Sequence, residues 1–344
     1  MTGQNQWARK KAELLANGKI FIPSHIKLPY PLERSTAGPA AGSLSITLSY
    51  HGKNIKLEVC KKHQQTFSLQ KNDDTYQIFK EGKEFLDHVI LLPTPFHAPG
   101  QIFINLDNRC IYNCAFCNRT THSFLQKYDE EIFIDLILRA SKRHDISAIA
   151  LTSGIYPDNS RIITMMGRII QQVKTAIPDI PIGVEPSIFK KEEIAFLKKA
   201  GADEIKINLQ LPNKYLFDKI CPNLHFDTIK TMLRASVEIF GRGKVTSNII
   251  FGLGESDACI QDAIEYLAKI GVVATLRKIR INQNNKEKIE KALSTTLPQT
   301  TAERILFLAS EQKKILEHHN LTSQTFNTMC HSCGCCDIVP FWDI

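Results

Sequence analysis

Three cysteines within eight residues are the part of the sequence best suited to metal chemistry. Cys110, Cys114 and Cys117 follow an apolar run, residues 101–106, with the pattern of a buried strand. Thiolates are soft ligands that suit iron, zinc or copper. A closed zinc site or an ordinary electron-transfer cluster uses four protein ligands, so a loop with three thiols leaves one metal position open.

A second group of cysteines lies near the C-terminus. Cys330, Cys333 and Cys336 stand three residues apart, and Cys335 lies between the last two. Such density in a chain of 344 residues favours a metal centre over disulfides. We expect an auxiliary [4Fe-4S] cluster here, with structural zinc as the alternative. Either Cys335 or His331 can supply a further ligand.

Composition and charge narrow the function classes. Hydrophobic residues make up 43% of the chain, which is ordinary for a globular protein with a core. The net charge of +8 comes from scattered Lys and Arg, so we expect a solvated basic surface or an acidic protein partner rather than nucleic-acid binding. No run has the length of a membrane span or the apolar core of a signal peptide, which predicts a cytoplasmic protein without membrane contact. The isolated Cys60, Cys221 and Cys259 read as small buried residues.

Strand and helix patterns alternate from residue 101 onward. Strand candidates occupy residues 101–106, 147–152, 181–184, 204–209, 245–251 and 273–281. Helical periodicity falls between them, at residues 130–142, 160–176, 190–200, 226–239 and 256–270. This alternation predicts an α/β fold with parallel strands and right-handed crossovers, in the form of a partial (β/α)6 TIM-like barrel. Functional residues of such barrels lie at the C-terminal ends of the strands.

The segments on either side of the barrel have different patterns. Residues 1–98 combine a polar helix, a proline-rich stretch and alternating strands with a hairpin at residues 43–59, which predicts a small β subdomain that packs without taking part in the chemistry. Residues 99–285 are assigned to the barrel. Residues 286–344 contain a long helix, 301–318, and the second group of cysteines. We expect this arm to fold back over the barrel mouth.

The first cysteine loop resembles the signature of the radical S-adenosylmethionine (SAM) superfamily. The resemblance rests on thiols spaced by three and two residues, on the aromatic Phe116 before the last, and on the position after the first strand. It implies that Cys110, Cys114 and Cys117 hold a [4Fe-4S] cluster whose fourth iron is chelated by SAM. In that family SAM is cleaved to a 5'-deoxyadenosyl radical, which takes a hydrogen atom from the substrate. An electron donor such as ferredoxin or flavodoxin is also implied.

Further strand ends resemble the SAM contacts of the same family. Ser153 and Gly154 stand where the family has a Gly-Gly-Glu-like segment that meets the SAM amine, although only the glycine matches. Glu185, after the third strand, can accept hydrogen bonds from an amine or a ribose. Asn208 and Gln210 resemble the Asn-Leu-(acid) strand end of biotin and lipoyl synthases, with glutamine in place of the acid, and we expect them to share one face of a strand.

The fifth strand ends in a third element of this kind. Ile250, Gly252 and Glu255 match an Ile-x-Gly-x-x-Glu element, which packs on the adenine in relatives. Arg234, and Arg277 and Arg280 near the last strand, are candidate anchors for a carboxylate, with a ring of structural ion pairs as the alternative.

The strand ends favour sulfur insertion, in which an auxiliary cluster of biotin and lipoyl synthases donates sulfide to an unactivated C–H position. Standard lipoyl synthases place their auxiliary cysteines before the radical loop, but none precede Cys110 in that arrangement here. The order resembles the split lipoyl synthases, which implies an octanoylated lipoyl-domain protein and a second radical SAM component as partners. A maturase, a methyltransferase or a rearrangement enzyme is the alternative within the family. A zinc-binding scaffold or a nucleic-acid-binding module is the alternative outside enzymes.

Overall fold

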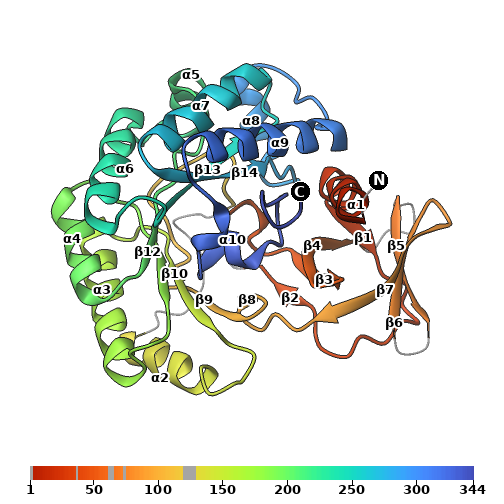
Figure 1. The fold of residues 1–344 in the computed structure, drawn as a ribbon, viewed down its shortest axis with the longest axis horizontal. Coiled ribbons are helices and arrows are strands. Elements are labelled where there is room, and N and C mark those ends of the chain that lie inside the picture. Colours follow the sequence, from red (N-terminus) through yellow and green to blue (C-terminus); the bar gives the residue numbers. More distant parts are fainter. Residues whose placement is uncertain (1–2, 36–37, 61–65, 73–74, 119–128) are drawn as a thin grey trace.

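The computed structural model describes residues 3–35, 38–60, 66–72, 75–118 and 129–344. Within these residues the chain forms two seven-stranded sheets that lie side by side, and most helices surround the second sheet (Figure 1). No helix in the described part of the chain is both long and apolar enough to cross a bilayer.

The first sheet comes from the N-terminal part of the chain. Its spatial order is β2 (Glu33–Arg34), β3 (Leu44–Tyr50), β4 (Lys53–Cys60), β1 (Lys19–Phe21), β5 (Phe67–Asn72), β6 (Thr75–Lys80) and β7 (Lys83–Leu92). Pairing of β7 with β3 closes six of these strands into a small barrel. The predicted hairpin is confirmed as β3–β4, where His51 and Gly52 both have positive φ, as a tight two-residue hairpin turn requires.

The second sheet is the predicted partial barrel. Its order is β8 (His97–Ala98), β9 (Gln101–Asn105), β10 (Ala148–Thr152), β11 (Ile182–Glu185), β12 (Glu204–Lys206), β13 (Val245–Phe251) and β14 (Val272–Lys278). The pairs from β9 to β14 are parallel, whereas β8 is antiparallel to β9. The pairings recorded in the described residues run from β8 to β14 without closing, so the barrel is open, as predicted.

Amphipathic helices cover the outer face of this barrel (Figure 1). They are α2 (Glu130–Ala140), α3 (Asn159–Ala176), α4 (Lys191–Ala200), α6 (Phe226–Phe240) and α7 (Asp257–Lys269), together with the short α5 (Lys214–Ile220) and α8 (Lys286–Leu293). Side chains cap several of them: Asp158 accepts from Arg161 N–H, and Ser256 accepts from Cys259 N–H. The sequence analysis missed α5 and α8 because helices of two turns give little periodicity.

Three helices outside the barrel connect the two ends of the chain. Helix α1 (Gly3–Asn17) packs against α9 (Ala302–His318), which in turn packs against α7. After α9, a short helix α10 (Met329–Cys333) carries the second group of cysteines to a position between the two sheets (Figure 1). The domain boundaries at residues 98 and 285 stay a prediction.

Candidate functional site

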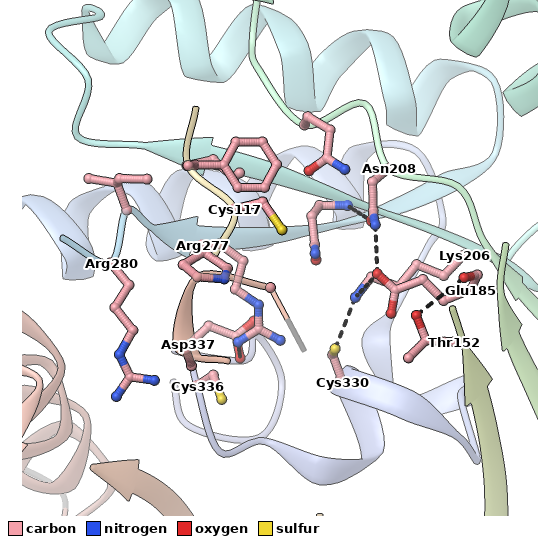
Figure 2. A pocket seen from close by; sticks show the side chains of 18 of the residues that line it. Cys117, Thr152, Glu185, Lys206, Asn208, Arg277, Arg280, Cys330, Cys336 and Asp337 are labelled. Carbon is pink, nitrogen blue, oxygen red and sulfur yellow. Dashed lines mark hydrogen bonds and ion pairs between the residues drawn. The ribbon is translucent and has the colours of Figure 1, made fainter. Parts of the chain in front are cut away.

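Both groups of cysteines line one cavity of about 450 Å³, which lies between the barrel strands and the first sheet. The thiol-bearing residues in its lining are Cys110, Cys114, Cys117, Cys330, Cys333, Cys335 and Cys336. Figure 2 shows Cys117 on one side of this cavity, with Cys330 and Cys336 on the opposite side. The fold therefore brings together the two motifs found in the sequence, although they are far apart along the chain.

The first cysteine loop is held at the C-terminal ends of the strands. Ile111 N–H donates to the carbonyl of Ile155 beyond β10, at 2.9 Å. The buried Asn285 side chain donates to the Phe116 carbonyl at 3.0 Å, and the Phe116 ring is itself buried. These contacts hold the loop from both sides, and its three thiols line the cavity.

A fourth thiol lies against this loop. Cys221, at the end of α5, is fully buried as predicted, but it also contacts Cys114. The hydrogen bond from Cys221 lowers the pKa of the Cys114 thiol and raises that of Cys221. Cys114 is therefore the better thiolate of the two. Nothing in the sequence spacing connects these residues, because they meet only through the fold.

The predicted strand-end residues Ser153, Gly154, Glu185, Asn208 and Gln210 all line the cavity. Asn208 Nδ2 donates to Glu185 Oε1 at 2.6 Å, which joins the ends of two neighbouring strands (Figure 2). Ser153 Oγ donates to the carbonyl of Gly154 at 2.6 Å, and Gly154 N–H is used within the fold. The site therefore offers a carboxylate and an amide group at its strand-end side.

The predicted alternation of Asn208 and Gln210 along one strand is wrong. Strand β12 ends at Lys206, and Gln210 has φ of 69°, so the backbone is no longer extended there. Gln210 forms an isolated bridge with Ile249, and its N–H donates to the Asn248 carbonyl at 3.0 Å. Both predicted residues line the cavity. They lie beyond the end of β12, and Gln210 has positive φ, so they are not alternate residues of an extended strand.

Of the three residues in the Ile-x-Gly-x-x-Glu element, Ile250 alone is among the described residues that line the cavity. The Glu255 carboxylate accepts from Gly252 N–H at 2.7 Å and pairs with Arg304 at 3.0 Å, with no exposed side-chain surface. Gly252 has φ of 95°, and a Cβ there would come within 2.5 Å of Thr300 Oγ1. These two residues shape the turn that supports Ile250.

The segment before the second group of cysteines enters the barrel at the N-terminal ends of the strands. Gln101, the first residue of β9, donates to the carbonyl of Met329 and accepts from its N–H. Glu204, the first residue of β12, accepts from the N–H and the hydroxyl of Thr328 at 3.0 and 2.6 Å. A Cβ on Gly183 would lie 2.1 Å from Thr328 Oγ1, so glycine makes room for the segment.

The expectation that this arm covers the barrel mouth is therefore wrong. The mouth, at the C-terminal ends of the strands, is where the first cysteine loop lies, whereas the arm enters from the opposite end. Short-range sequence patterns carry no information on such a contact. A signal exists in hindsight, since Gln101 and Glu204 are polar residues at the start of apolar strands, and both are buried.

Residues 104–267 match the family model described as the radical SAM superfamily. This part of the chain is a radical SAM domain. It includes the first cysteine loop and the ends of β9 to β13, whereas the end of β14 and the second group of cysteines lie beyond the matched residues. The resemblance found in the cysteine spacing is thereby confirmed.

Two curated proteins illustrate the similarity. The chain is 26% identical over 176 residues to a probable GTP 3',8-cyclase of Thermococcus kodakarensis, covering 50% of this chain and 54% of that protein. It is 28% identical over 200 residues to a biotin synthase of Citrifermentans bemidjiense, covering 54% of this chain and 56% of that protein. The chain thus spans about half the length of the curated relatives it matches.

Among solved structures, the chain resembles the FeFe-hydrogenase maturase HydG from Carboxydothermus hydrogenoformans. The TM-score is 0.50 at 17% identity, and the match covers 63% of this chain and 52% of HydG. At this identity the likeness supports the fold of the radical SAM domain and nothing finer.

The first sheet holds the second group of cysteines against the radical SAM domain. Asn54 Nδ2 donates to the Cys333 carbonyl at 3.3 Å, and Lys56 N–H donates to the Cys335 carbonyl at 2.9 Å. Both donors lie on β4. The expectation that the N-terminal β subdomain serves only for packing is therefore wrong, because β4 helps to build the cavity wall.

Helix α1 supplies a second contact to the same loop. The Lys11 ammonium, 1% exposed, donates to the Gly334 carbonyl at 2.7 Å and pairs with Asp343 at 2.7 Å. Trp7 Nε1 donates to the other oxygen of Asp343 at 3.0 Å. This buried network ties α1 to the residues on both sides of Cys335 and Cys336.

His331 points away from the cavity. Its Nε2 lies 3.0 Å from Thr246 Oγ1 and 3.4 Å from Thr275 Oγ1, inside the barrel. Burial lowers the pKa of His331 to about 3, so the ring is neutral. Of the two candidates for a further ligand in the second group, the structure favours Cys335, which lines the cavity.

The buried Lys206 and the half-buried Arg277 face the second group of thiols (Figure 2). Lys206 Nζ donates to Cys330 Sγ at 3.2 Å and lies 3.4 Å from Glu185. Arg277 pairs with Asp337 at 3.2 Å. Burial alone would lower the pKa of both cations, but Cys330 and Glu185 keep the pKa of Lys206 raised, and Asp337 and Cys330 do the same for Arg277. Positive charge at this position favours thiolates.

The thiols that line the cavity are ligands of the kind that an iron–sulfur cluster uses, in which each thiolate binds its own iron. Among the described residues, no group of three or more His, Cys, Asp or Glu side chains is placed to hold one metal ion. In the second group, a hydrogen bond with Cys335 lowers the pKa of Cys333 to about 7, which makes a thiolate accessible near neutral pH. Membership of the radical SAM superfamily implies a [4Fe-4S] cluster and SAM at the first loop.

Proposed function

We propose that the chain is a radical SAM enzyme in which two iron–sulfur centres face one substrate cavity. The observation that carries the proposal is that the two cysteine groups line the same cavity, one held at the C-terminal ends of the strands and the other entering from their N-terminal ends. A cluster on Cys110, Cys114 and Cys117, together with SAM, supplies a 5'-deoxyadenosyl radical when both are bound.

The strand-end residues of this chain would hold SAM beside that loop. Glu185 accepts hydrogen bonds, and its contact with Asn208 at 2.6 Å holds both side chains toward the cavity. Ser153 offers its backbone to SAM, Gly154 leaves room beside it and has its own N–H and carbonyl used within the fold, and Gln210 adds an amide. Ile250 provides the apolar surface that a purine ring needs, since it is 6% exposed and lines the cavity. Gly252 and Glu255 are not part of the cavity lining and contribute by supporting the turn that follows Ile250.

Cys330, Cys333 and Cys336 would hold the auxiliary [4Fe-4S] cluster, with Cys335 as a fourth ligand or a spare thiol. Lys206 and Arg277 support this assignment because they compensate the negative charge of bound thiolates in a buried site. The Lys56 N–H of β4 and the ammonium of Lys11 hold this loop through its carbonyl groups and leave the thiols available as ligands.

The reaction class that we propose is sulfur insertion at an unactivated C–H bond, as in lipoyl synthases. The similarity to biotin synthase and the opposed cysteine groups support it. On this proposal the substrate is an octanoylated lipoyl-domain protein, a second radical SAM component takes part, and ferredoxin or flavodoxin donates electrons. The similarity to a GTP 3',8-cyclase favours a rearrangement as the second candidate.

Single-cysteine variants test the two centres separately. An octanoylated lipoyl-domain peptide is incubated anaerobically with enzyme, SAM and reductant, and both 5'-deoxyadenosine and a sulfur-sized mass gain are measured. We expect both products from the unaltered chain, neither from Cys114→Ala, and 5'-deoxyadenosine alone from Cys333→Ala. Cys259→Ala, at a half-buried thiol on α7 outside the cavity lining, is the matched control and retains both.

The outcomes separate the parts of the proposal. Sulfur insertion by Cys333→Ala would refute the donor role of the second group. Absence of 5'-deoxyadenosine from the unaltered, iron-loaded chain would refute the radical SAM activity itself. 5'-Deoxyadenosine without a mass gain on the octanoyl peptide would point to the rearrangement instead.

A further inference from the structure

One end of the cavity carries more positive than negative charge. Lys19 of β1, Lys278 at the end of β14 and Arg280 just beyond it all line the cavity, and Glu58 of β4 lies among them. Glu58 is 3.5 Å from Arg280 Nε and 4.0 Å from Lys19 Nζ, so both ion pairs are long. In the described part of the chain, Glu58 is the carboxylate recorded with these three cations, which leaves an excess of positive charge.

Lys278 is the least compensated of the three. Its ammonium donates to the carbonyl of Ala16 at 2.7 Å, and no ion pair is recorded for it among the described residues. Burial, and then the like charges of Arg280 and Lys19, lower the pKa of Lys278 to about 8. The group is still mostly charged at neutral pH. A half-buried cation of this kind is costly unless an anion joins it.

This cationic end is separate from the strand-end residues that would hold SAM. Lys19 and Glu58 are register partners in the first sheet, whereas Glu185 and Asn208 belong to the far side of the barrel. Figure 2 shows Arg280 on the other side of Arg277 and Asp337 from Glu185 and Asn208. Arg277 and Lys206 each have a carboxylate partner. Among the described residues, no carboxylate partner is recorded for Lys278.

We propose that Lys19, Lys278 and Arg280 form a carboxylate-binding subsite that anchors an acidic group of the substrate at the seam between the two sheets. The guanidinium of Arg280 offers paired N–H donors to a carboxylate, and the two ammonium groups add charge without a fixed direction. The carboxylate belongs either to a free acid or to an acidic side chain beside the modified residue of a protein substrate. The choice of octanoyl probes rests on the proposed function, whereas the subsite itself is argued from the cations of this chain, so binding of octanoate can be tested whether or not sulfur insertion occurs.

Binding to the full-length chain, kept anaerobic, tests the subsite. The probes are octanoate and its neutral counterpart octanamide, measured by calorimetry. We expect octanoate to bind about tenfold more tightly than octanamide, and Lys278→Gln and Arg280→Gln each to weaken octanoate binding by about tenfold, since each removes one charge-assisted contact. Lys278→Arg should restore the affinity. Lys286→Gln, at an exposed lysine on α8, is the control and should change nothing.

Two further measurements decide the source of the carboxylate and guard against misfolding. An octanoyl-lysine peptide with flanking glutamates is compared with one carrying glutamines; a preference for the glutamates that Lys278→Gln abolishes assigns the subsite to a protein substrate, and no preference assigns it to a free acid. Circular dichroism checks each variant, and Arg280→Gln carries the test if Lys278→Gln does not fold. Equal binding of octanoate and octanamide, or a loss confined to SAM binding, overturns the proposal.

Discussion

Charged side chains around the cavity differ in how well they are compensated. Lys206 is buried and Arg277 half-buried, but each has a carboxylate within 3.4 Å, and the buried Lys11 has Asp343 at 2.7 Å. Lys278 has a carbonyl instead. The pairs hold segments together, because removing either partner leaves a buried charge exposed to an apolar surrounding. Lys278, for which no ion pair is recorded among the described residues, instead lowers the stability of the folded chain until an anion binds.

This difference predicts a pH dependence at Lys278. Its pKa is about 8 in the folded chain against 10.5 for the free group, so between these values the unfolded chain holds a proton that the folded chain has released. The free energy of unfolding should therefore rise with pH across that window, and the penalty is fully present below pH of about 8. Urea unfolding of Lys278→Met measures this. The variant should lose the rise and exceed the unaltered chain in stability at neutral pH; identical profiles would contradict the prediction.

At the scale of elements, sequence periodicity was sufficient to predict the strands and helices of the barrel, but not the position of α10 or the backbone conformation at Gln210. Strand β13 matches its predicted bounds, and the other barrel strands lie within a few residues of theirs. Apolar strands and amphipathic helices can be predicted in this way because their periodicity lies within a short stretch of sequence. Strand β12 is shorter than predicted, since Gln210 adopts positive φ, which no periodicity encodes. The arrival of α10 at the N-terminal ends of the strands depends on Gln101 and Glu204, whose partners lie more than a hundred residues away.

The candidate site divides in the same way. Cysteine spacing was enough to identify the first loop, and strand ends were enough to find Glu185 and Asn208, because both depend on short motifs. The contact of Cys221 with Cys114 and the roles of Lys206 and Lys278 were missed, since they arise from distant segments meeting in three dimensions.

The contact between α1 and the second cysteine loop predicts a coupled loss on mutation. Lys11→Met removes the donor to Gly334 and leaves Asp343 buried without its cation, which should cost about 3–5 kcal/mol of unfolding free energy. Alkylation of Cys333, followed by mass spectrometry, should become faster in this variant because the loop is less restrained. Arg9→Met, at an exposed neighbour on the same helix, is the control. Unchanged alkylation together with lost stability would limit Lys11 to a general packing role.

At the scale of the whole molecule, the residues that match the radical SAM family are not all of the residues that form the cavity. The radical SAM match ends at residue 267, whereas the cavity also takes its walls from β1, β4 and the segment after α10. The second group of thiols and the cationic end both lie outside the residues that match the family.

Iron content tests this view of the whole chain. After anaerobic reconstitution we expect about eight irons and eight sulfides per chain, and about four of each when Cys330 and Cys333 are both replaced by alanine. A chelator that strips the second centre should leave SAM binding intact. Zinc in place of iron in the unaltered chain would contradict both the count and the radical chemistry.

The contacts of α1 and β4 with the second cysteine loop also limit the order in which the chain can assemble. Lys11, Asn54 and Lys56 are synthesised before the barrel, whereas Cys333, Gly334 and Asp343 are synthesised after it. During synthesis, α1 and β4 therefore lack their contacts with the second cysteine loop while the barrel strands and the loop at Cys110 to Cys117 are being made. The first cysteine loop is thus synthesised well before the second, and the second cannot contact β4 until the segment beyond α9 has been made.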